Sequence, residues 1–192
     1  MSAAAFESHL LSAEAAEGRL DWAGLVEAVE ELQVDLGCVD FVLTSTLVAR
    51  LHWVAGWSAF AGDTPELAEA RLAVSFGLGM TAEDLRGPAA AAWERASERW
   101  RETSWAPGPG DGRHHVLGVL NGDFPDSLPF VVQVEHRGSV RRTEWLSAPI
   151  RPRPTVPRVG LLMGSVLVGS ASTWLWLDTV AAYRRACPER VC

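Results

Sequence analysis

The feature that most constrains the fold is the run from Cys38 to Phe60, CVDFVLTSTLVARLHWVAGWSAF, which is apolar on nearly every side of a helix. A helix without a polar face is buried either in a large core or in a membrane. Asp40, Arg50 and His52 interrupt the run. Because Arg50 stands near its middle, a membrane span would be costly. We therefore predict a central buried helix over 38–60, wrapped by its neighbours.

Helical signals surround this run, and we predict that residues 1–105 are helical. Apolar residues at positions 25, 29, 32 and 36 recur at helical spacing. Short amphipathic segments are predicted over 6–16 and over 88–103, the latter carrying Trp93. Helix starts, marked by a capping residue or an early proline, are predicted at Asp21, at Asp63–Glu66 and at Thr81–Asp84.

After the Gly/Pro-rich segment 106–112, which we interpret as a linker, the pattern becomes that of β-structure. Runs over 130–136 and 139–146 are rich in β-formers, with a turn between them. We predict an α+β protein: an N-terminal helical half around a buried central helix, then a small antiparallel sheet with a C-terminal packing helix. The two parts, 1–105 and 113–192, are expected to pack as one domain.

A second apolar run, VGLLMGSVLVGSASTWLWLD over 159–178, allows three interpretations. It is long enough to cross a bilayer, but glycine, serine and threonine dilute it. It could be a phosphate-binding loop before a helix, but no lysine follows its glycines. We favour the third interpretation, a buried strand over 159–168, a turn, and a helix over 173–186 that packs on the sheet.

Composition excludes some partners and compartments. A net charge of −7 disfavours nucleic acid, because phosphate binding needs a basic face. All 17 basic residues are arginine, which indicates a GC-rich bacterial genome. The first residues lack a basic leader region, and the three cysteines are an odd number, so we expect a reduced, cytoplasmic protein without a disulfide framework. Membrane attachment is disfavoured.

The apolar run 38–60 carries the main candidate site. Arg50 and His52 are polar groups at positions that we expect to be buried away from water, so each needs a hydrogen-bond or ion-pair partner. The expected partners are carboxylates of the preceding helix, namely Glu27, Glu30 or Glu31. Polar groups on an aromatic helix can line a ligand pocket, so we predict Arg50 and His52 as catalytic residues and Trp53, Trp57 and Trp93 as substrate-binding residues. The alternative is plain core packing, with Arg50 reaching to solvent.

The histidines of the second half give further candidates. His114 and His115 follow Asp111 and are predicted as catalytic residues, since imidazoles beside a carboxylate can move protons. Neighbouring residues of a strand point to opposite faces, so both cannot easily bind one ion, and no metal site is predicted. Glu135 is a candidate substrate-binding residue. It shares a strand face with Gln133, and the alternative is that this face is solvated.

Motifs of common enzyme classes, such as G-x-S-x-G, C-x-x-C and H-E-x-x-H, are absent from the sequence, and no cofactor is predicted. Two functions stay open. The first is a pocket protein for a hydrophobic small molecule, and, if it is an enzyme, one that cyclises, isomerises or dehydrates its substrate in bacterial biosynthesis. The second is a non-catalytic accessory or adaptor protein that binds a protein partner through a Trp/Arg-rich surface. A homo-oligomer is compatible with both.

Overall fold

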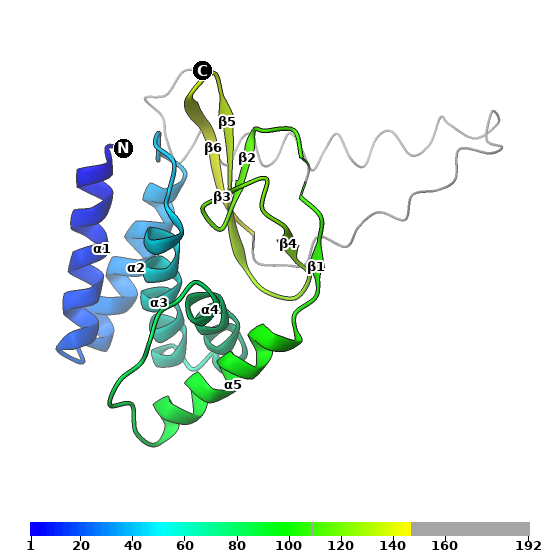
Figure 1. The fold of residues 1–192 in the computed structure, drawn as a ribbon. Coiled ribbons are helices and arrows are strands. Elements are labelled where there is room, and N and C mark those ends of the chain that lie inside the picture. The colour runs from blue at the N-terminus through cyan, green and yellow to red at the C-terminus, as the bar shows by residue number, and fades with distance from the viewer. Residues whose placement is uncertain (109, 147–192) are drawn as a thin grey trace, which may run out of the picture. The chain divides into compact units, whose positions relative to one another are not determined.

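The computed structural model describes residues 1–108 and 110–146, which belong to one compact unit. In this part of the chain five helices precede small antiparallel sheets, so the protein is α+β, as predicted. Figure 1 shows the helices gathered on one side and the strands on the other. Among the described helices, none is both long and apolar enough to cross a membrane. The predicted strand, turn and helix over 159–186 lie outside the described residues.

The first two helices, α1 (Ala3–Gly18) and α2 (Trp22–Leu36), lie side by side (Figure 1). Ser2 and Asp21 cap them, because each side chain accepts a hydrogen bond from the backbone N–H three residues further on. The cap at Asp21 confirms the prediction. The buried face of α2 has the predicted helical spacing and consists of Leu25, Val29, Leu32 and Leu36.

The third helix is shorter than predicted. The expected helix over 38–60 begins at Ser45, and α3 spans Ser45–Ala61. Thr44 sets this start, since its hydroxyl accepts a hydrogen bond from the N–H of Leu47 at 3.3 Å. The preceding residues 38–44, which we call the strap, are not helical and contact the sheet instead. Much of α3 is buried, including His52 and Trp57.

The last two helices, α4 (Pro65–Gly77) and α5 (Pro88–Glu102), each begin at a proline, as predicted. The predicted helix start at 81–84 is wrong. Asp84 has a φ of +63°, a left-handed conformation that a continuing helix does not tolerate. The two helices pack closely, because the ring of Trp100 lies where a Cβ at Gly77 would be.

The main sheet has four antiparallel strands in the order β3-β2-β5-β6. Its strands are β2 (His114–Val116), β3 (Val119–Leu120), β5 (Phe130–His136) and β6 (Ser139–Leu146). β5 and β6 coincide with the predicted strands, and the turn between them at Arg137-Gly138 has positive φ at both residues.

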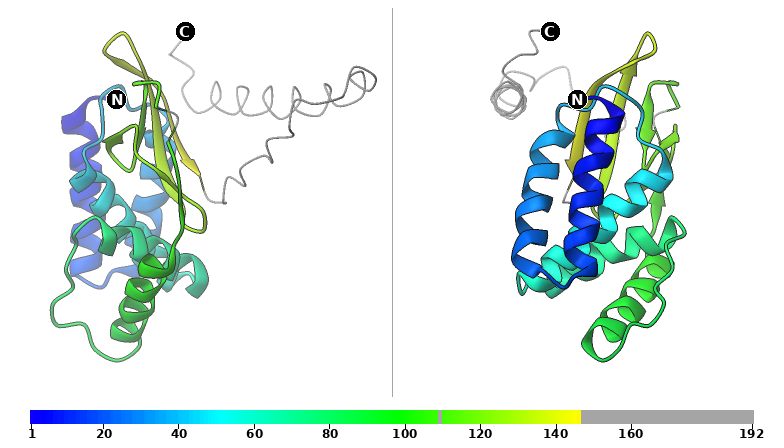
Figure 2. Two further views of the ribbon diagram at one scale, coloured as in Figure 1. Left: turned by 45° about the vertical axis from the view of Figure 1, so that its right-hand side comes forward. Right: turned by 90° about the vertical axis from the view of Figure 1, so that its left-hand side faces the viewer.

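The two faces of β5 have different partners. On one face, Phe130 packs on Phe124 of β4 (Phe124–Pro125), with the ring centroids 5.5 Å apart. β4 pairs with β1 (Trp105–Ala106) in a separate two-stranded sheet. On the other face, Gln133 stands opposite Thr143 of β6 and contacts the strap. Figure 2 shows the helices beside the sheet from two further directions.

Gln133 is the polar link between the sheet and the strap. It is 2% exposed, so the interpretation of its face as solvated is wrong for this residue. Its Oε1 accepts from the N–H of Leu43 at 2.7 Å, and its Nε2 donates to the carbonyl of Phe41 and to the hydroxyl of Thr143, both at 3.0 Å. The side chain thus satisfies backbone groups that a helix over 38–44 would have satisfied internally.

Cys38, the first residue of the strap, is disulfide-bonded in the structure. This differs from the expectation of a reduced protein without a disulfide framework. Cys187 and Cys192 lie outside the described residues. Because Cys38 forms a disulfide, the odd number of cysteines is no longer a reason to expect a reducing compartment.

Candidate functional site

Three residues from three elements meet at the boundary between the helices and the sheet. His52 of α3 is fully buried, and its ring centroid lies 4.9 Å from that of Trp145 on β6. The guanidinium carbon of Arg71 on α4 lies 4.8 Å from the centroid of the Trp145 ring. Trp145 thus contacts both a titratable ring and a cation. We call His52, Arg71 and Trp145 the His52 cluster.

Several buried polar atoms of the His52 cluster have no hydrogen-bond partner among the described residues. They are both ring nitrogens of His52, Nε of Arg71 and Nε1 of Trp145. Buried polar groups in folded proteins are nearly always hydrogen-bonded. Leaving one unsatisfied costs about 1–3 kcal/mol. Four such atoms within one cluster are an arrangement that the packing of a core does not explain.

The charges of the cluster are also unbalanced. Arg71 donates from Nη1 to the carbonyl of Ala55 at 3.1 Å, and no carboxylate of the described residues forms an ion pair with it. Burial lowers the pKa of Arg71. Burial first, and the charge of Arg71 second, lower the pKa of His52 to about 3. His52 is therefore a neutral imidazole near pH 7, with one N–H donor and one lone pair.

Arg50, the other polar residue predicted on this helix, lies in a different environment. It forms a two-fold ion pair with Glu14 of α1, with N–O distances of 2.6 and 2.7 Å. The pair raises the pKa of Arg50. The predicted partners on α2 are wrong, because α1 also packs on α3 and brings Glu14 closer. Residues two positions apart point to opposite sides of a helix, so Arg50 does not join His52.

The structure brings the three predicted tryptophans together. Trp53 packs edge-on against both Trp57 and Trp93, with centroid distances of 5.5 and 5.3 Å. Phe60 and Phe76 extend this cluster. Trp57 is 2% exposed, and its buried Nε1 has no hydrogen-bond partner over 1–108 and 110–146. Edge-to-face pairs of this kind are the favoured packing of aromatic side chains, so the cluster has the geometry of a core.

The predicted residues of the sheet form two separate pairs. Nδ1 of His114 lies 2.9 Å from Oδ1 of Asp111, and Nε2 of His115 lies 2.9 Å from Oε2 of Glu135. The separation follows from strand alternation, as predicted. The hydrogen bond from His114 is the main cause that lowers the pKa of Asp111. Over 1–108 and 110–146, no group of three or more His, Cys, Asp or Glu residues could hold a metal ion.

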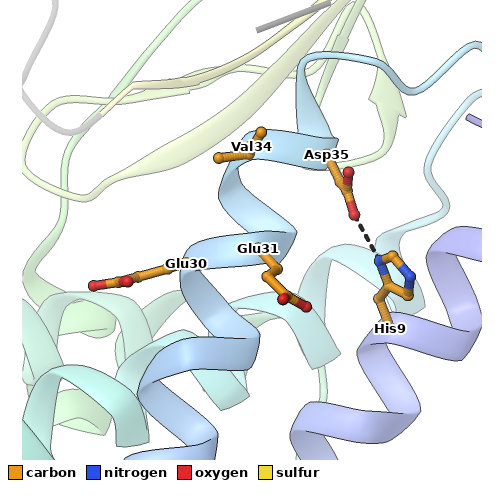
Figure 3. A pocket seen from close by; sticks show the side chains of 5 residues that line it. All are labelled: His9, Glu30, Glu31, Val34 and Asp35. Atoms are coloured by element: carbon orange, nitrogen blue, oxygen red, sulfur yellow. Dashed lines mark hydrogen bonds and ion pairs between the residues drawn. The ribbon is translucent and has the colours of Figure 1, made fainter.

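An open hollow of about 560 Å³ lies elsewhere, between α1 and α2 (Figure 3). It is lined by His9, Glu30, Glu31, Val34 and Asp35, and none of the predicted site residues contributes to it. In Figure 3 His9 and Asp35 meet at 2.6 Å, while Glu30 points away from them. An ordinary hydrogen bond between side chains of two neighbouring helices accounts for the contact between His9 and Asp35.

Sequence reasoning found His52 but missed Arg71 and Trp145. A signal existed for Arg71, which is a lone cation in the otherwise small and apolar stretch ARLAVSF. Trp145 carries no such signal, because its position opposite His52 depends on how the sheet meets the helices. Comparison of the chain with protein-family models, curated proteins and solved structures finds no match.

Proposed function

We propose that the protein binds a small molecule at the His52 cluster, through a polar group of a largely hydrophobic ligand. The observation that carries this proposal is the set of buried, unpartnered nitrogen atoms on His52, Arg71 and Trp145. Ligand sites combine an apolar wall with a few polar groups that fix the ligand. A bound polar group would satisfy atoms that are costly to leave unsatisfied.

Access to the cluster requires side-chain movement. His52 has no exposed surface, whereas Arg71 and Trp145 are both partly exposed. These two are the members that can swing aside to admit a ligand. Arg50, Trp53 and Trp93 then serve to hold α3 in place rather than to contact the ligand.

We propose that His52 binds the ligand and does not act as a general base at neutral pH. A general base works best with a pKa near the working pH, and burial holds the pKa of His52 at about 3. Cyclisation, isomerisation or dehydration at this site would need a bound group that raises the basicity of His52. His114, His115 and Glu135 remain candidates for catalysis at a separate place on the sheet.

The proposal is tested on the small molecules that the protein carries and on those it takes up. The protein is purified without denaturants and unfolded, and the released compounds are identified by mass spectrometry. In parallel, neutral and anionic amphiphiles are titrated while the indole N–H of Trp145 and the ring nitrogens of His52 are followed by NMR. We expect either that the purified protein carries a compound or that a titrated amphiphile shifts both signals. In His52→Phe we expect the compound to be absent and the Trp145 signal to stay in place during the titration. His114→Phe is the matched control. If no compound is carried and no amphiphile moves these signals, the proposal fails.

A second function, that of an accessory protein, is supported by a separate observation. Val119 and Leu120 on the edge strand β3 are 50% and 51% exposed, and Trp22 and Trp105 are each 39% exposed. Exposed apolar edges are sites of association. Light scattering over a concentration series tests whether a second copy binds there. A dimer that Leu120→Glu disrupts would favour this function, and a monomer at all concentrations would exclude the second copy as partner.

Location remains a sequence-based proposal. We propose a bacterial cytoplasmic protein in which the helical half wraps its central helix. The strand, turn and helix expected over 159–186 lie outside the described residues. In the part of the chain that the structure describes, no helix could span a membrane. The disulfide at Cys38 is the observation that speaks against a cytoplasmic location, because disulfides persist in oxidising compartments.

A further inference from the structure

We infer that the group bound by the His52 cluster is an anion, either a carboxylate or a phosphate. This inference rests on the proposed function and names the chemical class of its ligand. It follows from the kind of atoms that lack partners and from the charge of Arg71.

The unpartnered atoms are mostly donors. Nε of Arg71 and Nε1 of Trp145 each carry a hydrogen and cannot accept a hydrogen bond. The neutral ring of His52 adds a third N–H and a single lone pair. A ligand that satisfies this set must supply several acceptors at one place. Carboxylate and phosphate groups do so, whereas an alcohol accepts at most two hydrogen bonds and an amine one.

The charge of Arg71 selects an anion over a neutral acceptor. Three other arginines of the described residues have carboxylate partners: Arg50 pairs with Glu14, Arg95 with Glu69, and Arg142 with Glu144. Arg101 and the hydrogen bond of Arg99 to a backbone carbonyl are exposed, so water can solvate both charges. Among the described residues no carboxylate pairs with Arg71, although it is partly buried and its charge is only partly balanced by a carbonyl and the face of Trp145. Hydrogen bonds between ionised groups are roughly twice as strong as neutral ones. An anion would therefore supply the missing counter-charge.

The three donors belong to three different elements, which gives the site its specificity. α3 holds His52, α4 holds Arg71 and β6 holds Trp145. The His52 ring and the guanidinium carbon of Arg71 lie 4.9 and 4.8 Å from the centroid of the Trp145 ring, so we expect a single small group to reach all three residues once Arg71 moves. A cation would meet three hydrogens and a positive charge, so the cluster excludes it.

The test compares two probes of one shape. Benzoate carries a carboxylate, and benzamide is its neutral isostere. Each is titrated into the full chain while the indole N–H of Trp145, the Nε–H of Arg71 and the ring nitrogens of His52 are followed by NMR. We expect benzoate to shift all three signals and to bind at least roughly tenfold more tightly than benzamide, as a charge-assisted hydrogen bond implies. Acetate and inorganic phosphate should shift the same signals more weakly.

A matched pair of variants locates the effect. Arg71→Met should abolish the preference for benzoate. Arg101→Met should leave it unchanged, since Arg101 also lies over an aromatic ring, Phe76 at 5.6 Å, but is exposed. The signals of Arg71 and Trp145 in the unmodified chain keep the test decisive if Arg71→Met does not fold.

The outcomes separate this inference from the proposed function. If benzamide binds as tightly as benzoate, the ligand is neutral, the inference is wrong and the proposed function stands. If amphiphiles of other shapes move the signals but neither benzoate, acetate nor phosphate does, the inference is again wrong alone. If no compound of any class moves them, ordered water satisfies the cluster, and both are wrong.

Discussion

Gln133 and His52 are both buried polar side chains, but only Gln133 compensates the free energy of desolvation with hydrogen bonds to the described residues. Gln133 forms three hydrogen bonds, to Leu43, Phe41 and Thr143. Within the part of the chain that the structure describes, neither ring nitrogen of His52 forms one, and the side chain is uncharged instead, because burial lowers its pKa to about 3. The first side chain therefore contributes to stability, while the second reduces it and is available for binding.

Replacing Gln133 with leucine should destabilise the fold by roughly 2–4 kcal/mol, because it leaves the N–H of Leu43 and the carbonyl of Phe41 buried without partners. Chemical denaturation measures the change. Thr143→Val is the control, since it removes one of the three bonds and leaves the strap satisfied, and it should cost about 1 kcal/mol or less. Equal effects of the two substitutions would show that the strap does not depend on Gln133.

Protonation of His52 should make the fold sensitive to mild acid. Its pKa is about 3 in the folded chain and 6.5 in the unfolded one, so below pH 6.5 the unfolded state binds a proton that the folded state does not. Stability is unaffected by this group above pH 6.5 and is lost as the pH falls towards 3, at up to about 1.4 kcal/mol per pH unit. Urea denaturation across this range measures it. His52→Phe should remove that share of the slope, and an unchanged slope would contradict the assignment.

At the scale of elements, the helices are joined by a few specific contacts. The pair between Arg50 and Glu14 connects α3 to α1. A close approach connects α4 to α5, where Trp100 covers Gly77. Gly56 allows a third, between α3 and α4, since a Cβ there would lie 2.7 Å from Leu72. The first and third of these contacts hold α3 directly, and the second holds α4, on which α3 packs. Together they determine how rigidly His52 is placed.

Breaking the ion pair should cost an intermediate amount. Arg50 and Glu14 are 22% and 26% exposed, between the surface pairs that contribute up to about 1 kcal/mol and the buried ones whose loss costs about 3–5 kcal/mol. A double-mutant cycle of Arg50→Met and Glu14→Gln should give a coupling free energy of roughly 1–2 kcal/mol. A value near zero would mean that Arg50 is solvated and that the pair does not hold α1 to α3.

Adding a methyl group at Gly77 should loosen the contact between α4 and α5. In Gly77→Ala the ring of Trp100 must move, which should destabilise the fold by roughly 1–3 kcal/mol. Gly18→Ala is the control, since a Cβ at Gly18 meets nothing within 4 Å and alanine favours a helix. Thermal denaturation measures both variants. If Gly77→Ala melts no lower than Gly18→Ala, the close packing is absent.

At the scale of the whole molecule, local signals were readable from the sequence and contacts between distant elements were not. Caps and prolines placed the starts of α2, α4 and α5, and β-rich runs placed β5 and β6. The start of α3 was misplaced, because the strap is apolar like a helix but is fixed by Gln133, 90 residues later. The same limit applies to the candidate site. The burial of His52 was predictable from the apolar residues around it in the sequence. Its neighbours Arg71 and Trp145 were not, because they come from other elements that only the tertiary fold brings close to it.

The long separation in sequence between the strap and Gln133 delays the formation of their contact during synthesis. The strap precedes α3, yet the atoms that satisfy it are made 90 residues later. At a synthesis rate of about 5–20 residues per second, roughly 5–20 s pass on the ribosome between the two. During that interval the nascent helices can pack on one another and around α3, while the strap stays hydrated and Trp145 is not yet present beside His52. The newborn chain therefore holds the strap and His52 without their partners from the sheet, and the rate of translation sets how long that lasts.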